Sequence, residues 1–181
     1  MPYLAVLNVQ DCALNLQTVK RVEATEDEIS RYRLESGDLV LTEGGDPDKL
    51  GRGTLWNNEI PDCIHQNHIF RVRLHSSAID PLFLSRLISS RRGKQYFLRS
   101  AKQTTGIASI NMTQLRQFPL LCPPIEIQRR FTEQIARIEA LAQHQQASLT
   151  KLDALFASLQ LRAFRGELTA KTAERELAEI G

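Results

Sequence analysis

One stretch near the end of the chain decides the fold: residues 131–163, with the sequence FTEQIARIEALAQHQQASLTKLDALFASLQLRA. Within it, apolar residues recur at alternating intervals of four and three, and Gln145 is the only polar member of the series. This period predicts a long helix with a coiled-coil seam, which at about 1.5 Å per residue would be roughly 50 Å long. The predicted seam consists of Phe131, Ile135, Ile138, Ala142, Gln145, Leu149, Leu152, Phe156, Leu159 and Ala163.

A seam this long and narrow exceeds what a compact domain can bury. The sequence therefore predicts a second helix, from another chain or from another part of the same assembly, and the polar Gln145 can set the register of the pair. The alternative is one long helix packed on its own globular domain. Pro123 and Pro124 mark a boundary before the helix, and Gly166 marks its expected end.

The residues before the prolines predict short strands, turns and short helices. A capping box of Thr25 and Glu28 predicts a helix over 25–32, and Asp80-Pro81 predicts the start of another at 80–88. Further helices are expected at 94–101 and 113–116, strands at 4–9, 19–22, 37–42, 54–56 and 68–74, an exposed glycine-rich loop at 43–53, and a polar turn-like segment at 102–111. The predicted fold is α+β, with a β-rich domain over 1–122, a long coiled-coil-forming helix over 123–168 and a charged C-terminal tail over 169–181.

The composition of the 181 residues, 42% hydrophobic and 24% charged, is typical of a soluble globular protein. No run approaches the roughly 18 apolar residues that a membrane span needs, and the start of the chain lacks the pattern of a secretory signal. Cys12, Cys63 and Cys122 are odd in number and far apart, which argues against a disulfide framework. We therefore expect a cytoplasmic protein with reduced thiols and no membrane partner.

The net charge of +2 conceals a strongly basic central block. The net charge is −5 over residues 1–80, +8 over 81–130 and −1 over 131–181. Such a block predicts a localised anion-binding surface, with nucleic acid as the commonest partner, and a solvated basic helix face as the alternative. Cationic side chains contact DNA phosphates, and polar side chains read base edges. On this basis the candidate DNA-binding residues are Lys49, Arg52, Gln66, Asn67, Arg91, Arg92, Lys94, Lys102, Gln103, Thr104, Thr105, Ser109 and Asn111.

No catalytic constellation is present in the sequence. There is no phosphate-binding loop and no dinucleotide fingerprint, and no nucleophile, base and orienting group can be named together. Cys63, His65 and His68 lack an evident fourth metal ligand. The segment at Cys122-Pro123-Pro124-Ile125 lacks the asparagine and the aromatic ring with which DNA amino-methyltransferases hold a flipped base. We predict neither catalytic nor metal-binding residues, and no enzyme activity.

Several blocks of the sequence together resemble the specificity subunit of type I restriction-modification systems. The similarity runs from residue 4 to about residue 169. The blocks are Leu7-Asn8-Val9-Gln10, residues 37–46 (GDLVLTEGGD), residues 65–73 (HQNHIFRVR), residues 101–111 (AKQTTGIASIN), Pro123-Pro124 followed by Gln128-Arg129-Arg130, and residues 164–168 (FRGEL).

The resemblance implies a non-catalytic subunit whose target-recognition domain binds one half of a bipartite double-stranded DNA target. Long helices separate two such domains by a fixed distance, which sets the half-site spacing. The resemblance also implies that methyltransferase and restriction subunits dock on the specificity subunit. S-adenosylmethionine, ATP and magnesium then belong to those partners, and no cofactor is expected on this chain.

The chain departs from the family in having one recognition domain and one helix, where typical members have two of each. From the resemblance we also expect the chain to begin inside the domain, without the strand region that would precede Leu4. Two interpretations follow: a half-length subunit that forms a homodimer through the seam, or a fragment or split gene product. The alternative function is a scaffold that does not bind DNA and assembles with methyltransferase or specificity subunits through its helix.

Overall fold

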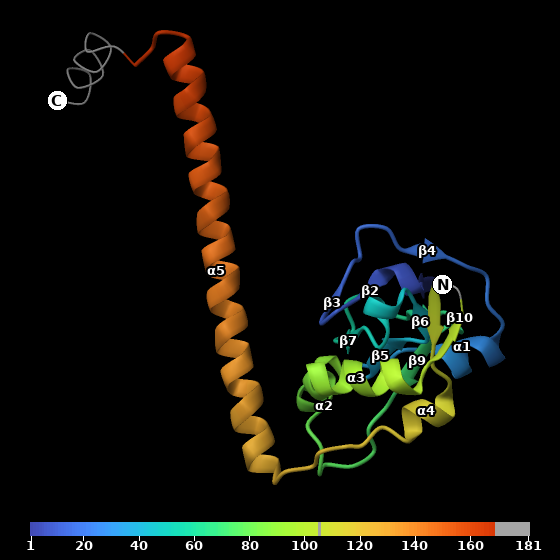
Figure 1. Cartoon of the computed structure of the whole chain (residues 1–181). Coiled ribbons are helices and arrows are strands. Elements are labelled where there is room, and N and C mark those ends of the chain that lie inside the picture. Colours follow the sequence, from blue (N-terminus) through green and yellow to red (C-terminus); the bar gives the residue numbers. More distant parts are fainter. Residues whose placement is uncertain (105, 169–181) are drawn as a thin grey trace. The chain divides into compact units, whose positions relative to one another are not determined.

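The computed structural model describes residues 1–104 and 106–168, and it confirms the α+β class. Internal contacts divide the chain into two units, Met1–Thr132 and Glu133–Gly181. The first unit holds all the described strands and the short helices (Figure 1). The division falls after the second turn of the long helix α5 (Ile125–Phe164), because Gln128 and Thr132 are buried. The boundary expected at residue 122 stays a prediction.

A three-stranded antiparallel sheet forms the centre of the first unit. Its order is β7 (Gly53–Leu55), β5 (Leu39–Thr42) and β9 (Ile69–Val72). All four residues of β5 are buried, and their alternation along the strand divides the core. Leu39 and Leu41 pack with Phe97 and Leu84 in one cluster, whereas Val40 packs with Trp56 in another.

The N-terminal segment differs from the single strand expected at 4–9. It forms β1 (Pro2–Leu4), a 3-10 turn η1 (Val6–Asn8) and β2 (Val9–Gln10), which pairs with β3 (Ala13–Leu14). The buried Asn8 explains the break, because its Oδ1 accepts a hydrogen bond from Ala5 N (2.9 Å) and its Nδ2 donates to Asn15 O and Thr18 O. An asparagine that satisfies the backbone locally competes with strand pairing.

A second small sheet has the order β4 (Lys20–Arg21), β1, β8 (Ile64–His65). The sequence did not predict β8, which pairs parallel to β1. Next to it, α1 (Glu26–Tyr32) begins with the predicted capping box, in which Glu28 N donates to Thr25 Oγ1.

The helices α2 (Pro81–Ser89) and α3 (Arg91–Ser100) follow each other almost directly. Asp80 caps α2 as predicted, accepting from Phe83 N (2.9 Å), and Ser90 caps α3, accepting from Gly93 N (3.2 Å). Gly93 lies inside α3, which therefore begins earlier than predicted. A Cβ at Gly93 would lie 2.0 Å from Ile88 O, so only glycine lets the two helices join this closely.

The segment expected to be turn-like, 102–111, is a hairpin. It consists of β10 (Lys102–Thr104) and β11 (Ile107–Ser109), and β11 pairs with β6 (Gly44–Gly45). β6 lies in the glycine-rich loop that was expected to be exposed, but Leu50, Gly51 and Gly53 of that loop are buried. That loop also contains the 3-10 turn η2 (Pro47–Lys49). A Cβ at Gly44 would lie 2.8 Å from Ala108 O, so the pairing of β6 with β11 depends on glycine there. The short helix α4 (Met112–Arg116) follows at its predicted place.

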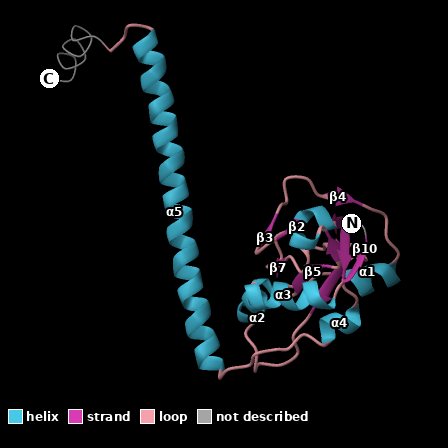
Figure 2. Cartoon of the chain, viewed as in Figure 1, coloured by secondary structure: helices cyan, strands magenta, loops and turns pink. Residues whose placement is uncertain are grey.

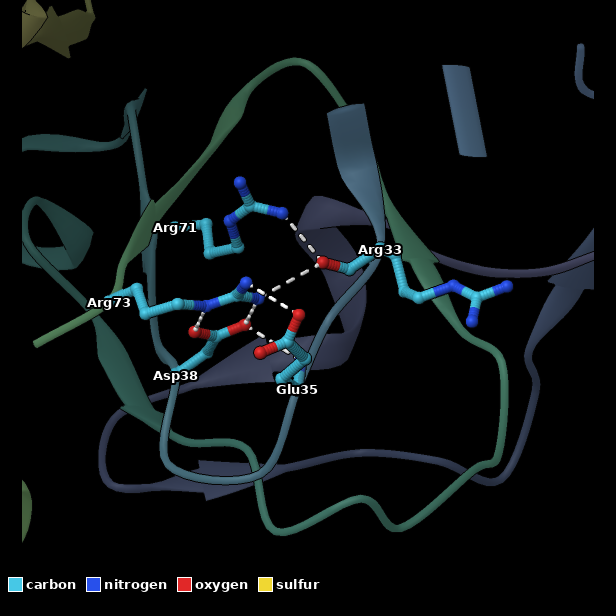
Figure 3. Close-up of polar contacts among 5 residues, drawn as sticks. All are labelled: Arg33, Glu35, Asp38, Arg71 and Arg73. Carbon is cyan, nitrogen blue, oxygen red and sulfur yellow. Dashed lines mark hydrogen bonds and ion pairs between the residues drawn. The ribbon is translucent and has the colours of Figure 1, made fainter. Parts of the chain in front are cut away.

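An ion pair between the half-buried Arg73 and the buried Asp38 joins the end of β9 to the turn before β5 (Figure 3). Arg73 donates from Nε to Asp38 Oδ1 and from Nη2 to Asp38 Oδ2, both at 2.7 Å, and from Nη1 to Glu35 Oε1 at 2.6 Å. Asp38 is only 1% exposed and also accepts from Glu35 N (2.8 Å). These hydrogen bonds to Asp38 are the main reason that the pKa of the Arg73 guanidinium is raised.

The helix α5 is unbroken over 40 residues (Figure 2), which corresponds to a length of about 60 Å. Its first turn is held by Gln128, fully buried, whose Oε1 accepts from Asp80 N (2.9 Å) and whose Nε2 donates to Ala78 O and Pro123 O. At its other end, Gly166 has a φ of +72°, and Glu167 N donates to Arg162 O (2.9 Å). This is the Schellman geometry that stops a helix, as the sequence predicted. The charged tail 169–181 lies outside the described residues.

Candidate nucleic-acid interface

Two arginines of the basic block are exposed at the start of α3. Arg91 and Arg92 occupy its first turn, where the helix dipole disfavours positive charge. Lys94 is half-buried and forms an ion pair with Asp11. Exposed cations at this position are available to an anionic ligand, whose negative charge would offset both their mutual repulsion and the dipole.

The structure brings the predicted residues Lys49, Arg52 and Lys94 near one another around the β2–β3 turn. Arg52 Nη1 donates to Gln10 Oε1 (3.2 Å), and Lys94 reaches the adjacent Asp11. The loop carrying Lys49 and Arg52 rests on α3 at Gly51. This glycine has a φ of +70°, and a Cβ there would lie 2.6 Å from the Phe97 ring.

Other predicted residues lie on the β10–β11 hairpin and beside it. Lys102 is exposed and pairs with Ser109 across the hairpin. Gln103 and Thr104 belong to β10, while Thr105 lies outside the described residues. Their role in sequence preference stays a prediction.

Asn111 has a structural role that accounts for its side chain. Its Oδ1 accepts from Gln114 N (2.9 Å), and Gln114 Oε1 accepts from Asn111 N (2.7 Å), which closes a capping box on α4. An asparagine used as a helix cap is held by the backbone, so Asn111 is a poor choice for a base-contacting residue.

The three polar residues at 66–68 have different surroundings. Gln66 Oε1 accepts from Val6 N (3.1 Å), whereas Asn67 is exposed. His68 Nδ1 lies 2.7 Å from Glu43 Oε2. Nearby, His65 is buried against the Tyr32 ring, and burial is the main cause that lowers its pKa.

Cys63, which stands with His65 and His68 in the sequence, is buried, and burial raises the pKa of its thiol to about 11. Among the described residues, no cluster of three or more His, Cys, Asp and Glu side chains could hold a metal ion. Within the same residues, no helix combines the length and apolar character that crossing a bilayer requires.

Two hollows flank β6, and they include residues that the sequence did not single out. One, of about 430 Å³, is lined by Glu43, His68 and Ser109 among others. The other, of about 290 Å³, is lined by Gln10, Thr42 and Arg52 among others. Gln10 and Thr42 could not be predicted as site residues. Thr42 lies beside Arg52 because β5 pairs with β7 and Thr42 N donates to Arg52 O, and Gln10 meets Arg52 through a hydrogen bond across 42 positions.

The predicted seam of α5 is exposed along most of its length. The side chains of Ile138, Leu152 and Phe156 are 62–63% exposed, and that of Leu149 is 50% exposed. Phe131 differs, because its ring packs edge to face on Phe83 at 5.7 Å between centroids. The first seam residue thus packs inside the first unit, and the later ones form an apolar stripe that presents its side chains to solvent.

The chain thus combines a β-rich unit that carries exposed cations with one long amphipathic helix. The chain is 29% identical over 175 residues to the StySPI specificity subunit of a type I restriction enzyme from Salmonella potsdam, covering 93% of this chain and 37% of that protein. It is 26% identical over 176 residues to the EcoKI specificity subunit of Escherichia coli K12, covering 94% and 38%. It is 25% identical over 138 residues to the putative MjaX specificity subunit of Methanocaldococcus jannaschii, covering 76% and 32%.

These comparisons confirm the resemblance stated from the sequence. The chain is a relative of the specificity subunits of type I restriction enzymes over most of its own length. It spans a little over a third of the length of the first two of these relatives. No family model matches the chain.

Proposed function

We propose that the first unit is a target-recognition domain that binds one half of a bipartite double-stranded DNA target within a type I restriction-modification complex. The observation that carries this proposal is the similarity to named specificity subunits over more than nine-tenths of the chain. The exposed Arg91 and Arg92 supply cations of the kind that contact DNA phosphates.

In this proposal the chain contributes recognition and carries no catalysis or cofactor of its own. Methyltransferase and restriction subunits would supply the chemistry, with S-adenosylmethionine, ATP and magnesium bound by them. The exposed stripe of α5 would pair with the same stripe of a second copy. Such pairing would bring two recognition domains together and bury side chains such as Leu152 and Phe156.

A scaffold that assembles through α5 without binding DNA is the second candidate function. It is favoured by the length of the exposed stripe. The two candidates predict the same assembly and differ in DNA binding alone, so a DNA titration separates them.

Replacing Arg91 and Arg92 together by glutamine is expected to weaken binding to all DNA sequences about equally. Each phosphate contact that is lost lowers the slope of log K against log salt by about 0.9, so the slope should fall by about two. Fluorescence anisotropy of labelled duplexes over a range of salt concentrations measures both quantities.

The matched control is Arg137→Gln with Lys151→Gln, which removes the same charge from exposed positions on α5. It should leave both the affinity and the slope near those of the unmodified chain. An unchanged slope in the Arg91 and Arg92 variant, or a loss confined to one DNA sequence, would contradict the assignment of these arginines to phosphates.

A further inference from the structure

The hollow of about 290 Å³ beside β6 contains an arginine that is held in place from two sides. The Arg52 guanidinium donates from Nη1 to Gln10 Oε1 (3.2 Å), and Gln10 is itself fixed because its Nε2 donates to Leu7 O (2.8 Å). The Arg52 backbone is fixed as well, since Thr42 N donates to Arg52 O at 2.9 Å. Within the described part of the chain, the other guanidinium N–H groups have no recorded partner, which leaves donors in a rigid fork.

A buried hydroxyl in the same hollow also lacks a partner. Thr42 is 3% exposed and lines the hollow, and its Oγ1 forms no hydrogen bond with any described residue. Buried polar side chains are nearly always hydrogen-bonded, so such an atom calls for an explanation. A ligand with polar atoms at the mouth of the hollow would supply the missing bond.

The local charges favour the edge of a base over a phosphate in this hollow. Asp46 and Lys49 both line it and form an ion pair with each other. Lys49 is therefore already paired, and a phosphate entering the hollow would meet the carboxylate of Asp46. A base edge carries partial charges only, and the guanidinium of Arg52, whose charge also acts on Asp46, can donate to its acceptor atoms.

We propose that Arg52, oriented by Gln10, recognises a guanine in the major groove of the DNA half-site. An arginine fork donates in parallel to O6 and N7 of guanine, a pattern that no other base presents there. Gln10 is then a positioning residue. This inference rests on the proposed function, because it assumes that the first unit binds DNA.

The test is a selection by the full chain from a pool of duplexes with randomised central base pairs, at one fixed salt concentration. The unmodified chain should enrich a sequence with guanine at one fixed position. Arg52→Gln should keep the rest of that sequence and lose the preference at this position. Its affinity for the original sequence should fall by about 5- to 150-fold, the range expected for one bidentate contact.

Two further variants separate recognition from folding and from charge. Arg52→Lys keeps the charge and loses the planar fork, so it should lose the guanine preference and keep the salt slope. Gln10→Ala should reduce the preference at the same position, again without altering the slope. Arg21→Gln, at an exposed site on β4, is the control and should behave like the unmodified chain.

The outcomes distinguish this inference from the proposed function. A uniform loss of affinity for all duplexes in Arg52→Gln, or a selection identical to that of the unmodified chain, would overturn the guanine contact and leave DNA recognition standing. If the unmodified chain enriches no sequence, the proposed function itself fails, and the inference fails with it.

Discussion

Replacing Arg73 by methionine is expected to lower the free energy of unfolding by about 3 kcal/mol, the lower end of the cost of breaking a buried ion pair, because Arg73 itself is 29% exposed. The reason is that Asp38, 1% exposed, would lose the two charge-assisted hydrogen bonds that Arg73 donates to it, and Glu35 would lose the third. Only the bond that Asp38 accepts from Glu35 N would remain. Chemical denaturation followed by circular dichroism measures the change.

Arg71→Met is the matched control, since the side chain of Arg71 makes one hydrogen bond in this cluster, from Nη1 to Arg33 O at 2.6 Å (Figure 3). Its loss should cost about 0.5–1.5 kcal/mol. The double variant Asp38→Leu with Arg73→Met should recover most of the stability, because apolar residues often replace a buried ion pair without loss. Equal effects of the two single arginine variants would contradict the assignment of the large effect to the buried carboxylate.

Replacing Leu152 and Phe156 together by aspartate is expected to abolish self-association through α5. Burying a large apolar side chain contributes about 1.5–3 kcal/mol, and each copy would lose two such side chains and gain two charges in the seam. The dissociation constant should rise by more than about a thousandfold, since each 1.4 kcal/mol is tenfold. Light scattering should report twice 20.5 kDa for the unmodified chain and 20.5 kDa for the variant.

Ala147→Asp with Ala154→Asp provides the control for this experiment. Both alanines are exposed on α5 and lie off the seam, so the control adds the same charge without touching the stripe. It should remain a dimer. Two results would contradict pairing through the stripe. One is an unmodified chain that is monomeric at every concentration tested, and the other is a variant with aspartate at Leu152 and Phe156 that remains a dimer.

The helices were predictable because their signals are local. Thr25, Asp80 and Gly166 act on backbone groups within a few residues, so the chain positions of these side chains alone indicate where helices begin and end. The seam was predictable for a similar reason, since the period of α5 depends on the spacing of its own residues.

The features that could not be predicted from the sequence depend on contacts between distant segments. The hairpin of β10 and β11 exists because β11 pairs with Gly44 and Gly45, more than sixty positions earlier. Arg73 pairs with Asp38 across 35 positions, and Arg52 meets Gln10 across 42. No local pattern marks these partners. Arg52 was therefore predictable as a DNA-binding candidate from its charge, whereas Gln10, which orients it, was not.

Asn111 has a local role that its spacing to Gln114 indicates. The two residues stand at capping-box spacing before a short helix, and they cap that helix in the structure. A contact between Asn111 and a base stays a prediction. Asparagine at a helix start satisfies the backbone first.

Sequence-specific DNA recognition is tested most directly by the ratio of two affinities of the full chain at one salt concentration. One affinity is for the duplex that the chain enriches from a randomised pool, and the other is for a shuffled duplex of the same length and base composition. We expect a ratio of about a thousandfold or more, as for other sequence-specific DNA-binding proteins. A ratio near one, with self-association through α5 intact, would contradict sequence recognition and favour the scaffold.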